Sequence, residues 1–229
     1  MRISRLYHPE QLTCGKEVTL NAEASNHLVK VLRTRPGSPL VLFTGDGCDY
    51  QATTLDDNAR KTRVSIETKI EKSNESNLDI TLIQGLSRHD RMDATIQKSI
   101  ELGVNRIIPV LCQRSNAKLD ASKRDKKLSH WKKIAISACE QSGRSIIPEI
   151  SEIIPLSKLC SHQDAKRLLL DPESSTGLKD IDIKGNTVEI LIGPEGGLNT
   201  EEISQLADTG FTSICFGPRI LRTETAGPA

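Results

Sequence analysis

Two glycine-rich segments near the C-terminus carry the residues best suited to ligand chemistry. Residues 191–198 read Leu-Ile-Gly-Pro-Glu-Gly-Gly-Leu after the apolar run 188–192, and residues 216–226 follow the short apolar run 213–216. Glycine has no Cβ, so such turns let the backbone approach a ligand closely. Glu195 disfavours a phosphate cradle, because a carboxylate repels an anion. The segments therefore predict a pocket for a neutral or cationic ligand with an adenosine-like body.

The position of these turns after predicted strands supports a shared pocket. In an open α/β sheet, ligands bind outside the carboxyl ends of the strands, so the two turns could form two walls of one site. The competing interpretation of the first turn is an ordinary strand-to-helix connection. Asn199 and Glu202 have the spacing of a capping box for a helix over residues 201–209. The first turn alone leaves both interpretations open.

Taken together, the two segments resemble the signature of the SPOUT class of RNA methyltransferases. The matching residues are Ile192-Gly-Pro-Glu-Gly-Gly197 and Ile220-Leu-Arg-Thr-Glu-Thr-Ala226. Within that class the chain is similar to the ribosomal RNA small subunit methyltransferase E family, which methylates N3 of a uridine in 16S rRNA. Weaker matches follow in order along nearly the whole chain: Arg2-Ile3-Ser4-Arg5-Leu6, residues 27–33, Pro36-Gly37, residues 90–93 and 97–104, Arg114-Ser115, Trp131 and residues 140–144.

The resemblance implies an α/β fold with a C-terminal, trefoil-knotted, parallel-sheet domain of the SPOUT type and a small N-terminal PUA-like β-barrel. It places the RNA-binding barrel at residues 1–72 and the methyltransferase domain at residues 73–229. It also implies a homodimer in the cytoplasm that acts on 16S rRNA or the assembled small ribosomal subunit. In the family a helix follows the Thr-Glu-Thr-Ala segment. Because the chain ends at Ala229, we expect that helix to be missing, which would affect knot closure, dimer packing and cofactor affinity.

The cofactor implied by the resemblance is S-adenosylmethionine, held by backbone groups and by apolar contact with adenine. Glu195 would either favour the sulfonium or fix the loop. The implied pocket residues are Leu170, Ile192, Gly193, Glu195, Gly196, Gly197, Phe216, Gly217, Ile220, Leu221 and Thr223.

Arg222 is the main catalytic candidate. Uridine N3 carries a proton at neutral pH, and a cation would stabilise the charge that develops as this proton leaves. Glu224 is a weaker candidate for the base. The alternative for Arg222 is a structural ion pair with Glu224 or Glu195. The candidates for RNA binding are Arg2, Arg5, Arg33, Arg91, Lys98, Arg114 and Arg144, and ordinary surface charge is the alternative for the first three.

The composition sets limits on the class of protein. The net charge is only +1, but residues 114–144 hold nine Lys or Arg and three Asp or Glu, which suits either a phosphate backbone or a solvated helix face. Six cysteines without a Cys-x-x-Cys pair and five scattered histidines predict reduced thiols and no metal site. No apolar stretch approaches the ~20 residues of a membrane span, and the N-terminus lacks a signal peptide's apolar core.

Hydrophobic periodicity divides the chain near the polar run at residues 71–77. Before it we expect strands at residues 18–20, 40–43, 50–55 and 62–70 and a helix at residues 24–32. After it strands and helices alternate, as in a parallel α/β domain. The expected strands are 80–84, 107–111, 167–170, 188–192 and 213–216, and the expected helices are 91–102, 123–142 and 201–209.

Three other functions remain open from the sequence. A related knotted enzyme could methylate a ribose 2′-oxygen or a guanine. A non-catalytic RNA-binding assembly protein would not need the two glycine turns. A small-molecule enzyme with a phosphorylated cofactor is disfavoured by the absence of Gly-x-Gly-x-x-Gly and by Glu195.

Overall fold

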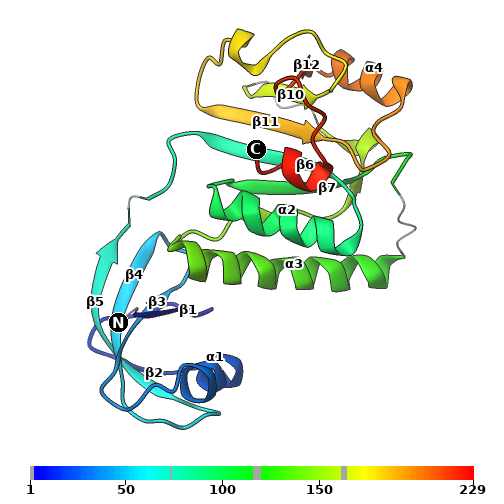
Figure 1. Ribbon diagram of the computed structural model, residues 1–229. Coiled ribbons are helices and arrows are strands. Elements are labelled where there is room, and N and C mark those ends of the chain that lie inside the picture. The colour runs from blue at the N-terminus through cyan, green and yellow to red at the C-terminus, as the bar shows by residue number, and fades with distance from the viewer. Residues whose placement is uncertain (1–2, 73, 116–119, 161–163) are drawn as a thin grey trace. The chain divides into compact units, whose positions relative to one another are not determined.

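The computed structural model describes residues 3–72, 74–115, 120–160 and 164–229, which fold into two compact units (Figure 1). The first unit takes in the described residues up to Glu75 together with residues 139–147, and the second takes in residues 76–138 and 148–229. Sequence reasoning did not anticipate that residues 139–147 belong to the first unit. Their contacts are distant in sequence, as where the Gly47 N–H donates to the Ser145 carbonyl over 3.1 Å.

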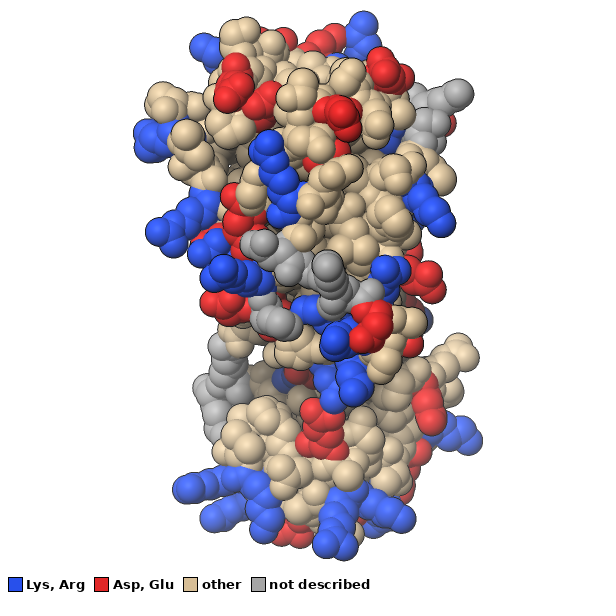
Figure 2. Space-filling model, turned by 90° about the vertical axis from the view of Figure 1, so that its right-hand side faces the viewer, with Lys and Arg blue, Asp and Glu red and all other residues tan. Residues whose placement is uncertain are grey.

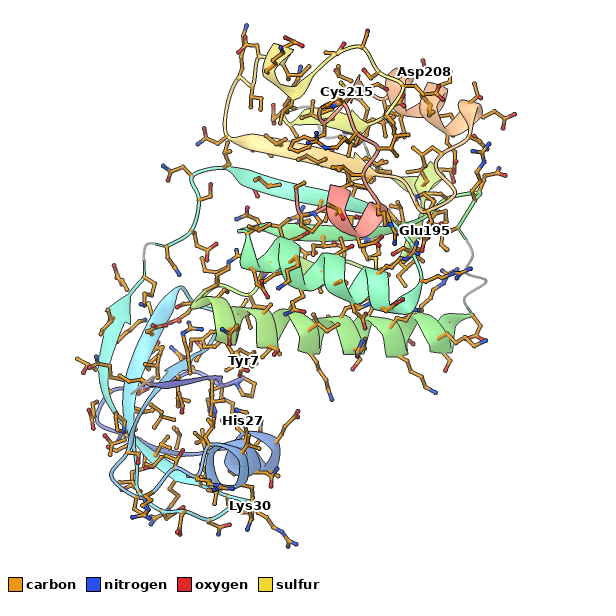
Figure 3. The ribbon with its side chains drawn as sticks, viewed as in Figure 1. Tyr7, His27, Lys30, Glu195, Asp208 and Cys215 are labelled. Atoms are coloured by element: carbon orange, nitrogen blue, oxygen red, sulfur yellow. The ribbon has the colours of Figure 1, made fainter. Side chains whose placement is uncertain are left out.

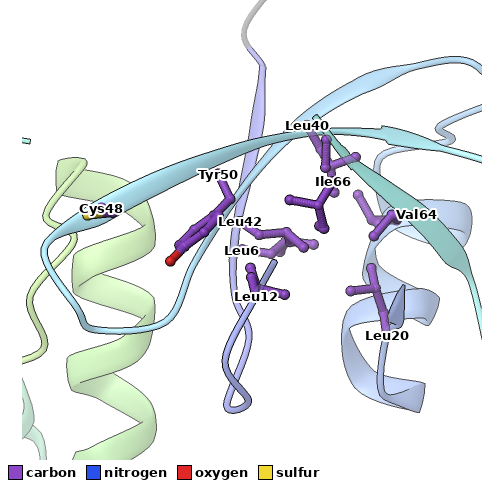
Figure 4. Close-up of a cluster of buried hydrophobic side chains, with 11 residues drawn as sticks. Leu6, Leu12, Leu20, Leu40, Leu42, Cys48, Tyr50, Val64 and Ile66 are labelled. Carbon is purple, nitrogen blue, oxygen red and sulfur yellow. The ribbon is translucent and has the colours of Figure 1, made fainter. Parts of the chain in front are cut away.

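The first unit is built on a five-stranded sheet with the order β1-β3-β4-β5-β2. Its strands are β1 (Ser4–Tyr7), β2 (Glu17–Thr19), β3 (Pro39–Phe43), β4 (Cys48–Thr54) and β5 (Arg63–Glu71). β1 runs parallel to β3, and the other neighbours are antiparallel. The alternation predicted for β5 buries Val64 and Ile66 in a core with Leu40 and Leu42 (Figure 4). β1, which sequence reasoning missed, forms one end of the sheet.

A short helix of the first unit differs from the single α-helix expected at residues 24–32. α1 (Ala22–Asn26) starts where the Asn21 side chain accepts a hydrogen bond from the Ala24 N–H (2.8 Å), and it continues as a π-helix over His27–Val31. Arg33 follows with a φ of 53°, the left-handed conformation that usually requires glycine. The Thr34 N–H closes this helix end by donating to the Leu28 carbonyl over 3.0 Å.

Two arginines that we expected to bind RNA instead form ion pairs inside the first unit. The Arg5 side chain is 12% exposed; its Nη2 lies 2.8 Å from Asp49 Oδ1, and its Nη1 donates to the Cys139 carbonyl. Arg144 is 4% exposed, and its Nε donates to Glu75 Oε1 over 3.0 Å. Buried arginines need such partners because an unpaired charge is costly away from water. Both side chains are therefore held in largely buried ion pairs of this unit.

Asp49 shows how this buried pair depends on charge. Burial alone would raise the pKa of its carboxyl, but hydrogen bonds from Arg5 and Ser145 and the Arg5 charge bring the pKa below the ordinary value. The Asp49 carboxyl is therefore ionised in the folded protein at neutral pH. Its contribution to stability is present above the carboxyl's ordinary pKa and is lost as the pH falls through the lowered one.

The second unit is a parallel α/β fold, as the alternating pattern predicted. Its strands have the order β12-β10-β11-β6-β7-β8, with β9 also paired to β7, and every pair is parallel. They are β6 (Asp79–Gly85), β7 (Arg106–Leu111), β8 (Glu149–Ile150), β9 (Ile154–Pro155), β10 (Lys166–Leu170), β11 (Thr187–Ile192) and β12 (Thr212–Ile214). β11 thus returns beside β6, although they are far apart in sequence.

The helices of this part of the chain begin and end largely where capping residues predict. They are α2 (His89–Glu101), α3 (Ala121–Ser142), α4 (Thr200–Asp208) and α5 (Thr223–Ala226), with 3-10 turns at Leu156–Lys158 and Leu178–Asp180. Gly103 and Gly143, both with positive φ, end α2 and α3. The expected capping box at the start of α4 is present, since Asn199 Oδ1 accepts from the Glu202 N–H over 2.7 Å.

α2 and α3 lie side by side next to β6 and β7 (Figure 1). The stripe predicted on α3 is buried at Trp131, Ala135 and Ala138, and the Trp131 indole N–H donates to Asp93 Oδ1 on α2 over 3.0 Å. None of the described helices combines the length and the apolar character that crossing a membrane demands.

We predict that Arg144→Ala lowers the free energy of unfolding by about 3 kcal/mol, because it leaves the Glu75 carboxylate partly buried without its partner. Chemical denaturation would measure this change. Arg60→Ala, which removes an exposed arginine of the same unit, is the control and should change stability little. If Arg144→Ala unfolded like the unsubstituted protein but bound RNA more weakly, Arg144 would be a contact residue after all.

Candidate functional site

Loops at the carboxyl ends of β10, β11 and β12 surround one cavity of about 800 Å³. Because these strands are parallel, their carboxyl ends meet at the same edge of the sheet. The wall after β10 begins at Leu170, the wall after β11 begins at Ile192, and the wall after β12 begins at Cys215. The two glycine-rich segments singled out in the sequence therefore line one cavity.

The structure brings nearly all of the predicted pocket residues to this cavity. Those that line it are Leu170, Ile192, Gly193, Glu195, Gly197, Phe216, Gly217, Ile220, Leu221 and Thr223. Gly196 is the exception. A Cβ on Gly196 would lie 3.0 Å from the Cβ and 3.2 Å from the carbonyl oxygen of Arg114. Gly196 therefore allows the turn to pack against Arg114 and does not form the cavity wall.

The Gly-Pro-Glu-Gly-Gly turn packs tightly against the end of β6. A Cβ on Gly85 would lie 2.5 Å from the nitrogen of Pro194 and 2.8 Å from the carbonyl carbon of Gly193, closer than atoms can approach. Gly197 has a φ of 68° and donates its N–H to the Pro194 carbonyl over 2.8 Å. Glycine is thus required at these two positions for different reasons: close packing at one and backbone conformation at the other.

Glu195 ties this turn to the start of α2. Its Oε1 accepts a hydrogen bond from the backbone N–H of Arg88, the N-cap residue, over 3.0 Å, and lies 3.4 Å from Arg91 Nη1. A carboxylate is favourable near a helix N-terminus, where backbone N–H groups carry partial positive charge. Figure 3 shows Glu195 at this place beside α2. Of the two roles considered for Glu195, these contacts support fixing the loop.

Arg91 and Arg222 have different environments, although both line the cavity. Arg91 pairs with Glu195 and, over 3.8 Å, with Glu224. Arg222 is exposed at the start of α5 and has no ion pair among the residues that the structure describes. The structural ion pair considered for Arg222 is therefore not formed, because Arg91 takes both glutamates. The other carboxylate oxygen of Glu224, Oε2, is buried and has no hydrogen-bond partner within the described chain.

The Thr223 hydroxyl joins three segments at the floor of the site. It donates to the Gly193 carbonyl over 3.0 Å and accepts from the Gln84 side-chain amide over 2.9 Å. The sequence did not identify Gln84 as a residue of the site, because it stands in an apolar strand and its partner Thr223 is 139 residues away.

The remaining candidates for RNA binding lie in several places. Arg114 lines the cavity and donates through Nη1 to the carbonyls of Gly196 and Leu198, over 3.2 and 3.3 Å. Lys98 lies on α2, where it pairs with Glu101 over 2.8 Å. Arg33 is exposed on the first unit, and Arg2 lies outside the described residues. No single surface of one unit collects these residues.

The cavity also contains residues that the sequence did not reveal. Asp171 and Glu173 follow β10, and Cys215 follows β12 (Figure 3). Their place just after strands of a parallel sheet was the signal available.

Burial raises the pKa of Cys112, on a neighbouring loop, to about 12, so its thiol stays protonated at neutral pH. No cluster of metal-ligating side chains occurs among the residues placed by the structure.

Comparisons with known proteins agree over both units. Residues 74–229 match the RNA methyltransferase domain family, and residues 20–62 match the RNA methyltransferase PUA domain family. Ribosomal RNA small subunit methyltransferase E of Buchnera aphidicola is 35% identical over 98% of this chain and 92% of its own length. The protein of the same name from Bacillus subtilis is 32% identical over 95% of this chain and 89% of its own length.

Solved structures give the same result. The Neisseria gonorrhoeae ribosomal RNA small subunit methyltransferase E, bound to S-adenosylmethionine, is 37% identical, with a TM-score of 0.90 over 99% of this chain and 94% of that one. A Legionella pneumophila methyltransferase in complex with the same cofactor is also 37% identical, with a TM-score of 0.93 over 100% of this chain and 95% of that one. The chain belongs to the ribosomal RNA small subunit methyltransferase E family.

Proposed function

We propose that this protein transfers a methyl group from S-adenosylmethionine to N3 of a uridine in the 16S rRNA of the small ribosomal subunit. The observation that carries the proposal is the single cavity between the two glycine-rich loops, with the exposed cation Arg222 on its wall. The family supports the cofactor and the rRNA substrate. The cytoplasm is where we expect the enzyme to meet this RNA.

The cavity suits S-adenosylmethionine in size and chemistry. A volume of about 800 Å³ falls within the range of roughly 300–1,000 Å³ typical of small-molecule sites. Leu170, Ile192 and Leu221 supply apolar walls for an adenine ring. Gly193 and Gly217 leave backbone groups open to the ligand. Both signs of charge line the cavity: Asp171, Glu173 and Glu195, and Arg91, Arg114, Arg219 and Arg222. Bound there, the cofactor would supply an electrophilic methyl group.

In this proposal Arg222 stabilises negative charge on the uracil ring as the N3 proton leaves. Its guanidinium is not neutralised by Glu195 or Glu224, since Arg91 holds both. A cation already in place where charge develops stabilises that charge without reorganisation during the reaction. Glu224 is the weaker candidate, proposed to accept the proton. What supports it is its buried Oε2, which has no hydrogen-bond partner within the described residues.

The finer architecture is also proposed from the family. We infer a PUA-like RNA-binding barrel at residues 1–72 and a trefoil-knotted SPOUT domain at residues 73–229, which acts as a homodimer on 16S rRNA or the assembled subunit. The return of β11 beside β6 supports a chain path of this kind. Arg33 and Lys98, both exposed, stay proposed as RNA contacts together with Arg91 and Arg114 at the cavity.

The function is tested by incubating small subunits from cells that lack the modification with this protein and S-adenosylmethionine. Mass spectrometry of the rRNA nucleosides should find one added N3-methyluridine. A 2′-O-methylated nucleoside or a methylguanosine would assign the protein to another reaction of its class. RNA binding without any methylation would assign it to the assembly proteins.

Arg222→Ala should lower kcat by roughly 10²–10³-fold, the usual effect of removing one group that stabilises transition-state charge. The dissociation constant for S-adenosylmethionine should stay within about twofold, since the guanidinium is assigned to the substrate. Single-turnover kinetics and calorimetry measure the two effects. Arg219→Ala, an exposed arginine of the same loop, is the matched control. Equal losses of kcat in both variants would remove the special role of Arg222.

S-adenosylmethionine should slow the alkylation of Cys215, because this residue lines the cavity. The exposed Cys14 and Cys160 should react at unchanged rates and serve as internal controls. Iodoacetamide labelling followed by peptide mass spectrometry measures each rate. A Cys215 rate that is the same with and without saturating cofactor would contradict the assigned pocket.

Arg33→Gly should raise the free energy of unfolding by about 1 kcal/mol, because glycine adopts the left-handed conformation at φ 53° without the cost of a Cβ. The substitution should also lower the affinity for RNA and make that affinity less sensitive to salt concentration, because one phosphate contact is lost. Lys and Arg side chains gather over the first unit at the bottom of the face seen in Figure 2.

Denaturant unfolding and fluorescence anisotropy with a small-subunit rRNA fragment measure the two effects of this change. Arg35→Gly removes a neighbouring exposed arginine whose φ is not positive. It should therefore weaken binding without stabilising the fold. An Arg33→Gly protein that binds RNA with unchanged affinity and salt dependence would show that Arg33 is ordinary surface charge.

A further inference from the structure

Gln84 is a fully buried amide in the middle of the parallel sheet of the second unit. It is 0% exposed near the carboxyl end of β6, with Ile192 of β11 on one side and Pro109 of β7 on the other. The residues before it, Leu82 and Ile83, are buried and apolar, as is usual in a sheet covered on both faces. A polar side chain here needs a physical explanation.

The amide of Gln84 donates one hydrogen bond to the Gly85 carbonyl on its own strand, over 3.2 Å, and another that leads to both loops of the cofactor cavity. Its Nε2 donates to Thr223 Oγ1 over 2.9 Å, and Thr223 Oγ1 donates in turn to the Gly193 carbonyl over 3.0 Å. Thr223 begins α5, directly after Arg222, and Gly193 begins the Gly-Pro-Glu-Gly-Gly turn. One side-chain relay therefore connects a rigid strand, the turn after β11 and the segment that carries the catalytic candidate.

The same amide makes a second contact with the end of α5. A Cβ on Gly227 would lie 3.0 Å from Gln84 Oε1 and 2.9 Å from Thr95 Cγ2, so the backbone at Gly227 packs directly on both side chains. Gln84 thus contacts α5 at its first residue, Thr223, and the chain just after its last residue, at Gly227. The position of this short helix is fixed by the sheet beneath it.

The amide has an energetic cost that an apolar residue would not have. Gln84 Oε1 is buried and has no hydrogen-bond partner within the part of the chain that the structure describes. Leaving such an acceptor unsatisfied is unfavourable, and a methionine of similar shape would avoid the penalty. Glutamine instead donates hydrogen bonds to the Gly85 carbonyl and to Thr223, and the second of these is the one that reaches the loops of the cavity.

We propose that Gln84 is a positioning residue, which through the Thr223 hydroxyl couples the cofactor loop at Gly193 to the placement of Arg222. This inference rests on the proposed function and names a residue that supports it without contacting substrate. Occupation of the cavity and alignment of the cation then depend on the same relay.

A double-mutant cycle with Gln84→Met and Thr223→Val tests the coupling. Gln84→Met breaks one hydrogen bond of the relay and should weaken the affinity for S-adenosylmethionine by roughly five- to tenfold, and Thr223→Val breaks both hydrogen bonds and should weaken it at least as much. Because both changes break the same relay, the double variant should lose little more than Thr223→Val alone. Calorimetry gives the dissociation constants. Affinity losses that multiply in the double variant, or single variants that bind normally, would overturn the proposal.

Hydrogen exchange supplies a readout that needs no cofactor. The amides of Thr225 and Ala226, which donate to the Arg222 carbonyl over 2.9 and 2.8 Å, should exchange faster in both single variants. The amide of Ile203 in α4, which donates to the Asn199 carbonyl over 3.1 Å, should be unchanged. Unchanged exchange at Thr225 and Ala226 would also overturn the proposal.

Two further variants separate the relay from general damage. Thr223→Ser keeps the hydroxyl and should restore binding and exchange close to those of the unsubstituted protein, even if Gln84→Met fails to fold. Binding by Thr223→Ser as weak as that of Thr223→Val would assign the effect to the lost methyl group and overturn the relay. Thr62→Val removes a buried hydroxyl of the first unit, which donates to the Asn58 carbonyl over 2.9 Å, and should leave cofactor binding unchanged.

The outcomes distinguish this inference from the proposed function. If the unsubstituted protein did not bind S-adenosylmethionine, the proposed function would fall, whereas hydrogen exchange would still report on the relay. If it bound the cofactor and every variant bound equally well, the function would stand and the positioning role of Gln84 would fall.

Discussion

The absence of a side chain at Gly85 is the constraint on which the site depends. At the end of β6 the Gly193–Pro194 peptide comes so close that a Cβ would overlap it. This contact fixes how closely the Gly-Pro-Glu-Gly-Gly turn packs on the end of β6. In this position Glu195 accepts a hydrogen bond from the Arg88 N–H, and the Gly193 carbonyl accepts one from the Thr223 hydroxyl. A larger residue at position 85 would move both contacts at once.

The charges around the cavity divide the work between structure and chemistry. Arg91 forms ion pairs with both Glu195, in the turn after β11, and Glu224, in α5. Arg222, on the C-terminal wall of the cavity, is left without such a partner among the described residues. Arg91 is thus held by contacts within the site, whereas the Arg222 side chain is exposed on the cavity wall, and this difference is the basis of the role proposed for Arg222.

The sequence predicted the parallel sheet, most of its strands and the pocket loops, because these follow from local patterns. Glycines after apolar strands and a capping box at Asn199 are signals within a few residues of each other. It could not predict that Arg5 and Arg144 are buried. Their partners, Asp49 and Glu75, stand 44 and 69 residues away, and a charge count cannot distinguish such pairs from exposed cations.

Other differences have the same origin. β1 was missed because Ser4–Tyr7 is short and mixed in polarity, and only its pairing with β3 defines it as a strand. The helix expected at residues 24–32 widens into a π-helix, which no periodicity of 3.6 reveals. Gly196 was assigned to the pocket because it stands among pocket residues. In the structure Gly196 packs against Arg114 and does not line the cavity.

The buried carboxylate of Glu202 connects several segments on one side of the cavity. Besides capping α4, it accepts the Gln113 N–H over 2.8 Å, while the adjacent Arg114 grips the carbonyls of Gly196 and Leu198. Hydrogen bonds thus connect the loop after β7, the glycine turn and α4 to one another. Residues 216–220, in the loop after β12, are all exposed, so that side of the cavity is the more open to solvent.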